Sequence, residues 1–182
     1  AVVLGLLARG LFSPGRGSSV DLALRAAGRR DHRAAGEFWL ESGRRRKALR
    51  SFVRGKAFER AAEVARSLGD VAQAARLLQR QGEQSLGGAA QLYSRLGEDE
   101  KAQSLWLRQG QQHFENGQYE LAIEPFLRAG DSRRAAHAAE MALETKRLLP
   151  TLVDAAMRAG RESKRPLLAA RIAVAGGRFR EA

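Results

Sequence analysis

The sequence contains no cysteine, and only 6% of its 182 residues are aromatic. Without cysteine the chain can form neither disulfides nor thiolate metal sites, which is compatible with a reducing compartment such as the cytoplasm. Isoleucine is nearly absent, whereas alanine and leucine supply most of the apolar residues. Strands favour β-branched and aromatic residues, and helices favour Ala, Leu, Arg, Glu and Gln. The composition therefore predicts an all-α protein.

Residues that carry out catalysis are also scarce. The histidines His32, His113 and His137 are far apart and lack the spacing of metal ligands. No glycine-rich phosphate loop with its lysine is present, and no serine stands in a nucleophile-elbow motif. The acidic run Glu98–Glu100 lies where a helix is expected to start, which is a normal place for acids. We therefore expect no enzyme activity, no metal and no cofactor.

Basic residues outnumber acidic ones, and the excess is uneven. The formal charge is +12, divided into +9 for residues 1–66, −2 for residues 67–130 and +5 for residues 131–182. Such asymmetry favours an anionic partner at the two ends of the chain. A biased genome composition would give the same excess of arginine.

The first 19 residues differ from the remainder. Ala1–Leu7 is continuously apolar but much shorter than the about 20 residues that cross a bilayer. It is either the end of a membrane helix, with Arg9 and Arg16 on the cytoplasmic side, or a short helix that caps the domain. The breaker-rich residues 13–19 then form a linker. The first alternative predicts a membrane-associated protein.

An internal repeat begins after this segment. Glycine is followed five residues later by alanine at six places: Gly43/Ala48, Gly69/Ala74, Gly97/Ala102, Gly117/Ala122, Gly130/Ala135 and Gly177/Ala182. Glycine can take the left-handed conformation that ends a helix, and an acid after it can cap the next helix. Alanine one turn later allows close packing between helices. The pattern predicts short antiparallel helices stacked over residues 20–182, in an array cut short at its C-terminal end.

One copy of this pattern has a more specific spacing. It consists of Trp106, Gly110, Gly117, Tyr119, Ala122, Phe126 and Ala129. These residues resemble the signature of the tetratricopeptide repeat, in which the first glycine lies inside helix A and the second makes the turn. His113 stands where that family usually has an aromatic residue, and Pro125 predicts a kink or an open hydrogen bond in helix B. The other copies have shorter periods, similar to the solenoids of clathrin, coatomer and intraflagellar transport.

The resemblance implies a right-handed superhelical α-solenoid of antiparallel helix hairpins. It also implies a non-enzymatic scaffold that binds a peptide or helix of a partner protein in its groove. On helix A the inner face would include Ser104, Leu107, Gln111 and Glu115, which are therefore candidate partner-binding residues. These assignments come from the family and not from the residues alone.

The run Arg44, Arg45, Arg46 and Lys47 is the most distinctive charged element. It follows the turn glycine Gly43, at the start of a predicted helix, where cations oppose the helix dipole. It is either a solvated turn or a patch for an anionic partner, such as an acidic peptide. A basic surface that binds nucleic acid or anionic lipid is the alternative function. A purely structural segment of a larger multidomain protein is a further alternative.

Overall fold

A computed structural model describes residues 18–177, in which all regular structure is helical and no strand occurs. The predictions for the N-terminal apolar segment and most of its linker lie outside these residues. The α-helices are α2 (Ser19–Gly28), α3 (His32–Glu41), α4 (Arg45–Arg54), α5 (Phe58–Ser67), α6 (Val71–Gln81), α7 (Leu86–Arg95), α8 (Asp99–Glu115), α9 (Tyr119–Arg128), α10 (Ser132–Glu144), α11 (Val153–Glu162) and α12 (Pro166–Ala175). Two short 3-10 helices, Glu83–Ser85 and Pro150–Leu152, precede α7 and α11. The all-α prediction is confirmed.

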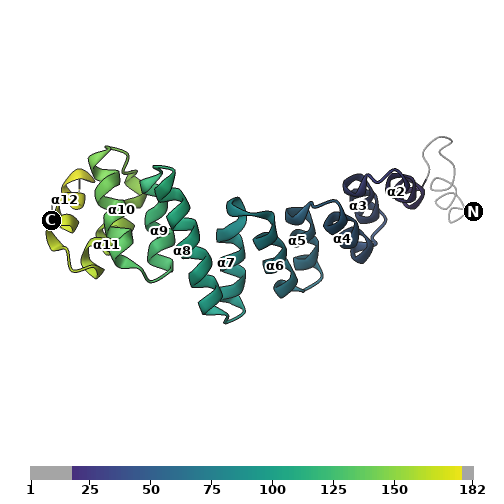
Figure 1. Ribbon diagram of the computed structural model, residues 1–182, viewed down its shortest axis with the longest axis horizontal. Helices are drawn as coiled ribbons and strands as arrows, with labels where there is room; N and C mark the ends of the chain where they lie inside the picture. The colour runs from purple at the N-terminus through teal and green to yellow at the C-terminus, as the bar shows by residue number, and fades with distance from the viewer. Residues whose placement is uncertain (1–17, 178–182) are drawn as a thin grey trace, which may run out of the picture. The chain divides into compact units, whose positions relative to one another are not determined.

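The helices form two compact units, divided between Leu68 and Gly69. In the first unit α2 packs on α3, α3 on α4, and α4 on α5. In the second unit each helix from α6 to α12 packs on the next one in the chain, and α9 also contacts α11. Within each unit, successive helices lie side by side in chain order (Figure 1). This order is the one expected of stacked helix pairs.

Glycines make most of the turns, as the repeat predicts. Gly43, Gly69, Gly97, Gly117, Gly130 and Gly177 all have φ between 70° and 81°. Helix α4 ends at Arg54, before Gly55, but here the left-handed residue is not the glycine. Gly55 has φ −78°, and the left-handed residue is Lys56, with φ 53°. Arg30, Lys146 and Lys164 have the same left-handed conformation after α2, α10 and α11.

Acidic caps follow two of the three turns where they were expected. The Asp70 side chain accepts a hydrogen bond from the Gln73 N–H at 2.8 Å, and Asp131 accepts one from the Arg134 N–H at 2.9 Å. Glu98 makes no such bond to the start of α8. Its carboxylate pairs instead with Lys101, one turn into the helix.

The core is built from the small residues of the repeat and from a few large ones. The repeat alanines Ala48, Ala74, Ala102, Ala122 and Ala135 are all buried. Phe52 and Phe126 are each 1% exposed and lie over glycines of the preceding helix. Because the alanines occupy little space, the helices can approach closely and leave room for these rings.

Gly110 lies inside α8, as the resemblance implies, and is buried. A Cβ at Gly110 would lie 2.7 Å from Cδ1 of Phe126, so only glycine lets α9 approach at this distance. Gly36 in α3 has the same role, because a Cβ there would lie 2.5 Å from Cε1 of Phe52. The first unit therefore contains a second hairpin with the spacing of Gly110, Gly117, Ala122 and Phe126, namely Gly36, Gly43, Ala48 and Phe52.

Among residues 18–177, two of the three prolines lie at helix starts. Pro166 is the first residue of α12, and Pro150 begins the 3-10 helix before α11. Pro125 lies inside α9, which continues without a break to Arg128. Because proline has no N–H, the Leu121 carbonyl lacks its usual partner in the helix. The helical pattern of residues 135–149 extends past the helix itself, since α10 ends at Glu144 and Lys146 turns the chain.

The outer side of α12 is apolar. Leu167 is 81% exposed and Val174 is 50% exposed, and Ala170 lies between them on the same face. Ala170 precedes the turn glycine Gly177 by the same number of residues as Gly110 precedes Gly117. In α8 the corresponding apolar residues pack against the core of the second unit.

Candidate interaction surfaces

The predicted partner-binding residues form one stripe along α8. Ser104, Leu107, Gln111 and Glu115 are spaced so that they share one face of the helix. The Ser104 hydroxyl donates to the Lys101 carbonyl at 2.8 Å, and the Gln111 amide donates to the Glu115 carboxylate at 2.8 Å. Ser104, Gln111 and Glu115 are exposed. Leu107 is half-buried and packs against the core, so part of its side chain already serves the fold.

Beside this stripe lies a small aromatic cluster. The Phe114 ring contacts the rings of Tyr119, Phe126 and His137, with centroids 5.0, 6.5 and 5.2 Å away. Nδ1 of His113 lies 2.9 Å from Oε1 of Gln118, at the turn between α8 and α9. Phe114 therefore supplies the aromatic contact at the end of α8, whereas His113 makes a polar contact with the turn.

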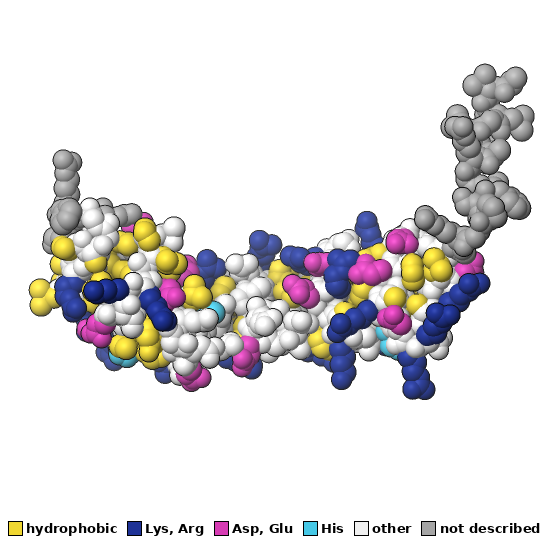
Figure 2. All heavy atoms as spheres, turned by 90° about the horizontal axis from the view of Figure 1, so that it is seen from above, with side chains coloured by type: hydrophobic (Ala, Val, Ile, Leu, Met, Phe, Trp, Pro, Cys, Tyr) yellow, Lys and Arg dark blue, Asp and Glu magenta, His cyan; other side chains and the backbone are white. Residues whose placement is uncertain are grey.

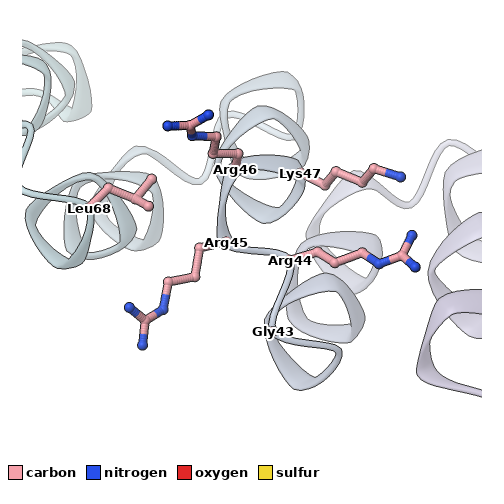
Figure 3. Close-up of a pocket in the computed structure, with 6 residues that line it drawn as sticks. All are labelled: Gly43, Arg44, Arg45, Arg46, Lys47 and Leu68. Carbon is pink, nitrogen blue, oxygen red and sulfur yellow. The ribbon is translucent and has the colours of Figure 1, made fainter.

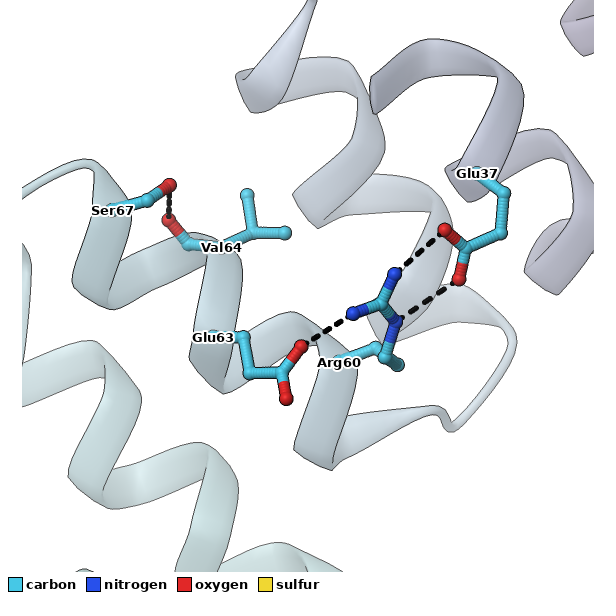
Figure 4. Close-up of polar contacts among 5 residues, drawn as sticks. All are labelled: Glu37, Arg60, Glu63, Val64 and Ser67. Carbon is cyan, nitrogen blue, oxygen red and sulfur yellow. Dashed lines mark hydrogen bonds and ion pairs between the residues drawn. The ribbon is translucent and has the colours of Figure 1, made fainter. Parts of the chain in front are cut away.

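The corresponding face of the first unit is held by an ion-pair network. Arg60 of α5 donates two hydrogen bonds to Glu37 of α3, at 3.0 and 2.7 Å, and one to Glu63 at 2.5 Å (Figure 4). The hydrogen bonds to Glu37 are the main reason why the pKa of Arg60 is raised above its ordinary value. Glu37 has the same place in its hairpin as Gln111 has in α8. The network ties α3 to α5, which are separated in sequence by α4.

The predicted basic patch divides into two sides at the start of α4. Arg44 and Lys47 lie over the Trp39 ring, with Cζ and Nζ at 5.6 and 4.6 Å from its centroid. Trp39 itself is buried, with 6% of its surface exposed. Arg45 and Arg46 extend away from this pair, toward the side of Leu68 (Figure 3). All four cations are exposed.

An open depression of about 390 Å³ lies at this patch. It is lined by Gly43, by the run Arg44–Lys47 and by Leu68, the residue that directly follows α5. Leu68 is 39% exposed and supplies an aliphatic wall beside the cations. This wall could not be predicted from the basic run, because Leu68 follows α5 and is distant from the run in the sequence.

The cationic surface continues along α4. Arg50 and Arg54 follow Arg46 at intervals of four residues, which places the three on one face of the helix. All three are exposed, and α4 contains no acidic residue. None of them makes an ion pair with any residue in the range 18–177. Lys and Arg side chains stand out from the N-terminal helices in the space-filling view (Figure 2). The repeated four-residue interval was visible in the sequence and was overlooked there.

The described part of the chain contains neither a cluster of metal ligands nor a membrane-spanning helix. Between residues 18 and 177, no group of three or more histidine, aspartate or glutamate side chains could hold a metal ion. In the same range, every helix is too short or too polar to pass through a lipid bilayer.

Comparison of the sequence with models of protein families, and with curated proteins, found no match.

Proposed function

We propose that this chain is a tetratricopeptide-like scaffold that binds a segment of a partner protein in the cytoplasm and catalyses no reaction. The proposal rests on one observation, which is that two helix hairpins share the same spacing of glycine, alanine and phenylalanine. Gly36 admits Phe52 in the first unit, and Gly110 admits Phe126 in the second. We further propose that the hairpins follow a right-handed superhelix, as in the family that they resemble. Repeat arrays of this kind present extended surfaces on which peptides and helices dock.

The α8 stripe is the proposed surface for a peptide. Ser104, Gln111 and Glu115 offer exposed hydrogen-bonding groups at successive helical turns, and Leu107 adds a partly exposed apolar contact. Polar groups spaced in this way can pair with the backbone and side chains of an extended segment. The Gln111–Glu115 hydrogen bond holds both side chains in place before the partner arrives, which lowers the entropy lost on binding.

Selection from a library of short random peptides displayed on phage tests this proposal. The chain is expected to enrich a set of related peptides. Gln111→Lys adds a cation that ties up Glu115, and it should weaken their binding by about tenfold. Gln91→Lys makes the same change at an exposed glutamine of α7 and should leave binding unchanged. Failure to enrich any peptide, or equal losses in both variants, would show that the α8 stripe is not a peptide site.

The basic face of α4 favours a second candidate function, which is binding of nucleic acid or anionic lipid. Arg46, Arg50 and Arg54 are exposed and have no carboxylate partner among residues 18–177. Binding of this kind depends on phosphate charge and falls steeply as salt is raised. Titration with duplex DNA and with phosphatidylserine vesicles at two salt concentrations tests it. A chain that binds neither these probes nor any peptide would instead be a structural segment.

A further inference from the structure

The start of α4 is built in a way that does not serve its stability. Helices α3, α6 and α10 begin with an aspartate whose side chain caps the first turn. Arg44 has that position in α4 and makes no capping hydrogen bond. The next three residues are also cations, which the positive end of the helix dipole disfavours. These residues therefore need an explanation other than the fold.

The two sides of the patch differ in what they already contact. Arg44 and Lys47 are held over the Trp39 ring by cation–π contacts. Arg45 and Arg46 make no ion pair and no ring contact within residues 18–177, and both line the depression beside Leu68. The side with free guanidinium groups is thus also the side with an aliphatic wall.

This combination fits one kind of partner better than the others. Guanidinium groups bind both carboxylates and phosphates through paired hydrogen bonds. A nucleic-acid backbone offers only its hydroxylated or phosphorylated sugar, and no aliphatic side chain, to pack on Leu68. The nearby aromatic rings of Trp39 and Phe52 are buried, so bases cannot stack on them. A peptide that carries acidic and aliphatic side chains can satisfy both the cations and the leucine.

We propose that this depression binds an acidic, leucine-containing segment of a partner protein. The carboxylates pair with Arg45 and Arg46, an aliphatic side chain packs on Leu68, and Arg50 extends the charged contact by one helical turn. The inference rests on the proposed function of a protein-binding scaffold. It uses a surface other than the α8 stripe, so the two can fail separately.

Fluorescence anisotropy with the full chain and a labelled peptide of alternating glutamate and leucine tests the proposal. The double variant Arg45→Glu/Arg46→Glu should weaken binding by at least about tenfold. Because acids suit the start of a helix, this variant should melt at a higher temperature than the parent chain, so lost binding would not reflect unfolding. Leu68→Gln should weaken binding by about threefold, since it removes the apolar contact alone.

Two controls separate this site from general attraction between opposite charges. Arg25→Glu changes the charge of an exposed arginine on α2 and should alter binding by less than about twofold. A peptide with serine in place of leucine should bind more weakly to the parent chain and equally to Leu68→Gln. Equal losses in Arg25→Glu and in the double variant would overturn the proposal.

Binding of other anionic probes, and the Gln111→Lys variant, test whether the surface and the partner are correctly assigned. Duplex DNA or phosphatidylserine vesicles that bind more tightly than the peptide, with no effect of Leu68→Gln, would assign the surface to phosphate and overturn the proposal. Gln111→Lys should leave binding of the acidic peptide intact. Loss of acidic-peptide binding in Gln111→Lys would place the peptide on α8 and contradict the assignment to α4.

Discussion

Two glycines inside helices determine how closely neighbouring helices pack. Gly36 and Gly110 both face a phenylalanine ring that has no room to move, because Phe52 and Phe126 are each 1% exposed. In an exposed helix, glycine is less favourable than alanine by about 1 kcal/mol. Here the close approach of the ring outweighs that preference.

Alanine at either position is therefore expected to lower the free energy of unfolding by about 1–2 kcal/mol, since crowding a packed core costs more than helix propensity returns. Chemical denaturation of Gly36→Ala and Gly110→Ala measures this loss. Gly28→Ala is the matched control, because a Cβ at this exposed position in α2 would have no atom within 4 Å. A more stable Gly110→Ala variant would show that Phe126 can move aside.

A different residue-scale effect is expected at Lys56. This lysine has φ 53°, a conformation that costs a side-chain-bearing residue about 1–2 kcal/mol. Lys56→Gly removes that cost but gives the unfolded chain more freedom, so we expect a net gain of about 0.5–1 kcal/mol. Thermal unfolding followed by circular dichroism measures the change. A lower melting temperature would mean that the lysine side chain stabilises the turn by more than the backbone strain.

At the scale of helices, α8 and α12 carry similar apolar stripes with different neighbours. Leu107 packs against the core of the second unit, whereas Leu167 is 81% exposed. Both leucines precede their turn glycine, Gly117 or Gly177, by the same number of residues. The surroundings of the residue, and not its place in the repeat, should set the cost of replacing it.

Leu107→Gln is expected to destabilise the chain by about 1–2 kcal/mol, because it removes buried apolar surface. Leu167→Gln should change stability by less than about 0.5 kcal/mol, as is usual for exposed positions. Urea titration of the two variants compares the effects. Equal losses would indicate that α12 is covered in solution.

The sequence predicted the helices and turns well because their signals are local. A glycine, an acid and an alanine within six residues suffice to end one helix and start another, as at Gly130, Asp131 and Ala135. The turn at Gly43 was predicted, but the role of Gly36 was missed because this glycine interrupts no helix and its partner Phe52 lies in the next one. Lys56 was missed because left-handed lysines have no local signature.

The candidate surfaces, too, could be predicted only in part, because they depend on contacts between helices. The run Arg44–Lys47 was recognised from the sequence. Its division into two sides depends on Trp39 in α3 and on Leu68 after α5, which are distant from it in the sequence. The α8 stripe came from a family resemblance. Its role in binding stays a prediction.

For the whole molecule, the serial packing of helices has an energetic consequence. In repeat arrays each element contacts mainly its neighbours, so a local loss of stability spreads only a short distance. Gly36→Ala should speed amide hydrogen exchange in α3 and α4 and leave α8 and α9 nearly unchanged. Gly110→Ala should do the reverse. Exchange followed by mass spectrometry tests both, and uniform acceleration in either variant would indicate one cooperative unit.

The apolar side of α12 offers a route to engineering. Ala170 is small and stands where α8 has Gly110, and Gly177 already turns the chain in the required left-handed conformation. A graft of the α9 sequence after this turn, combined with Ala170→Gly to make room for its phenylalanine, would cover Leu167 and Val174. The chain could thus be lengthened with its own parts.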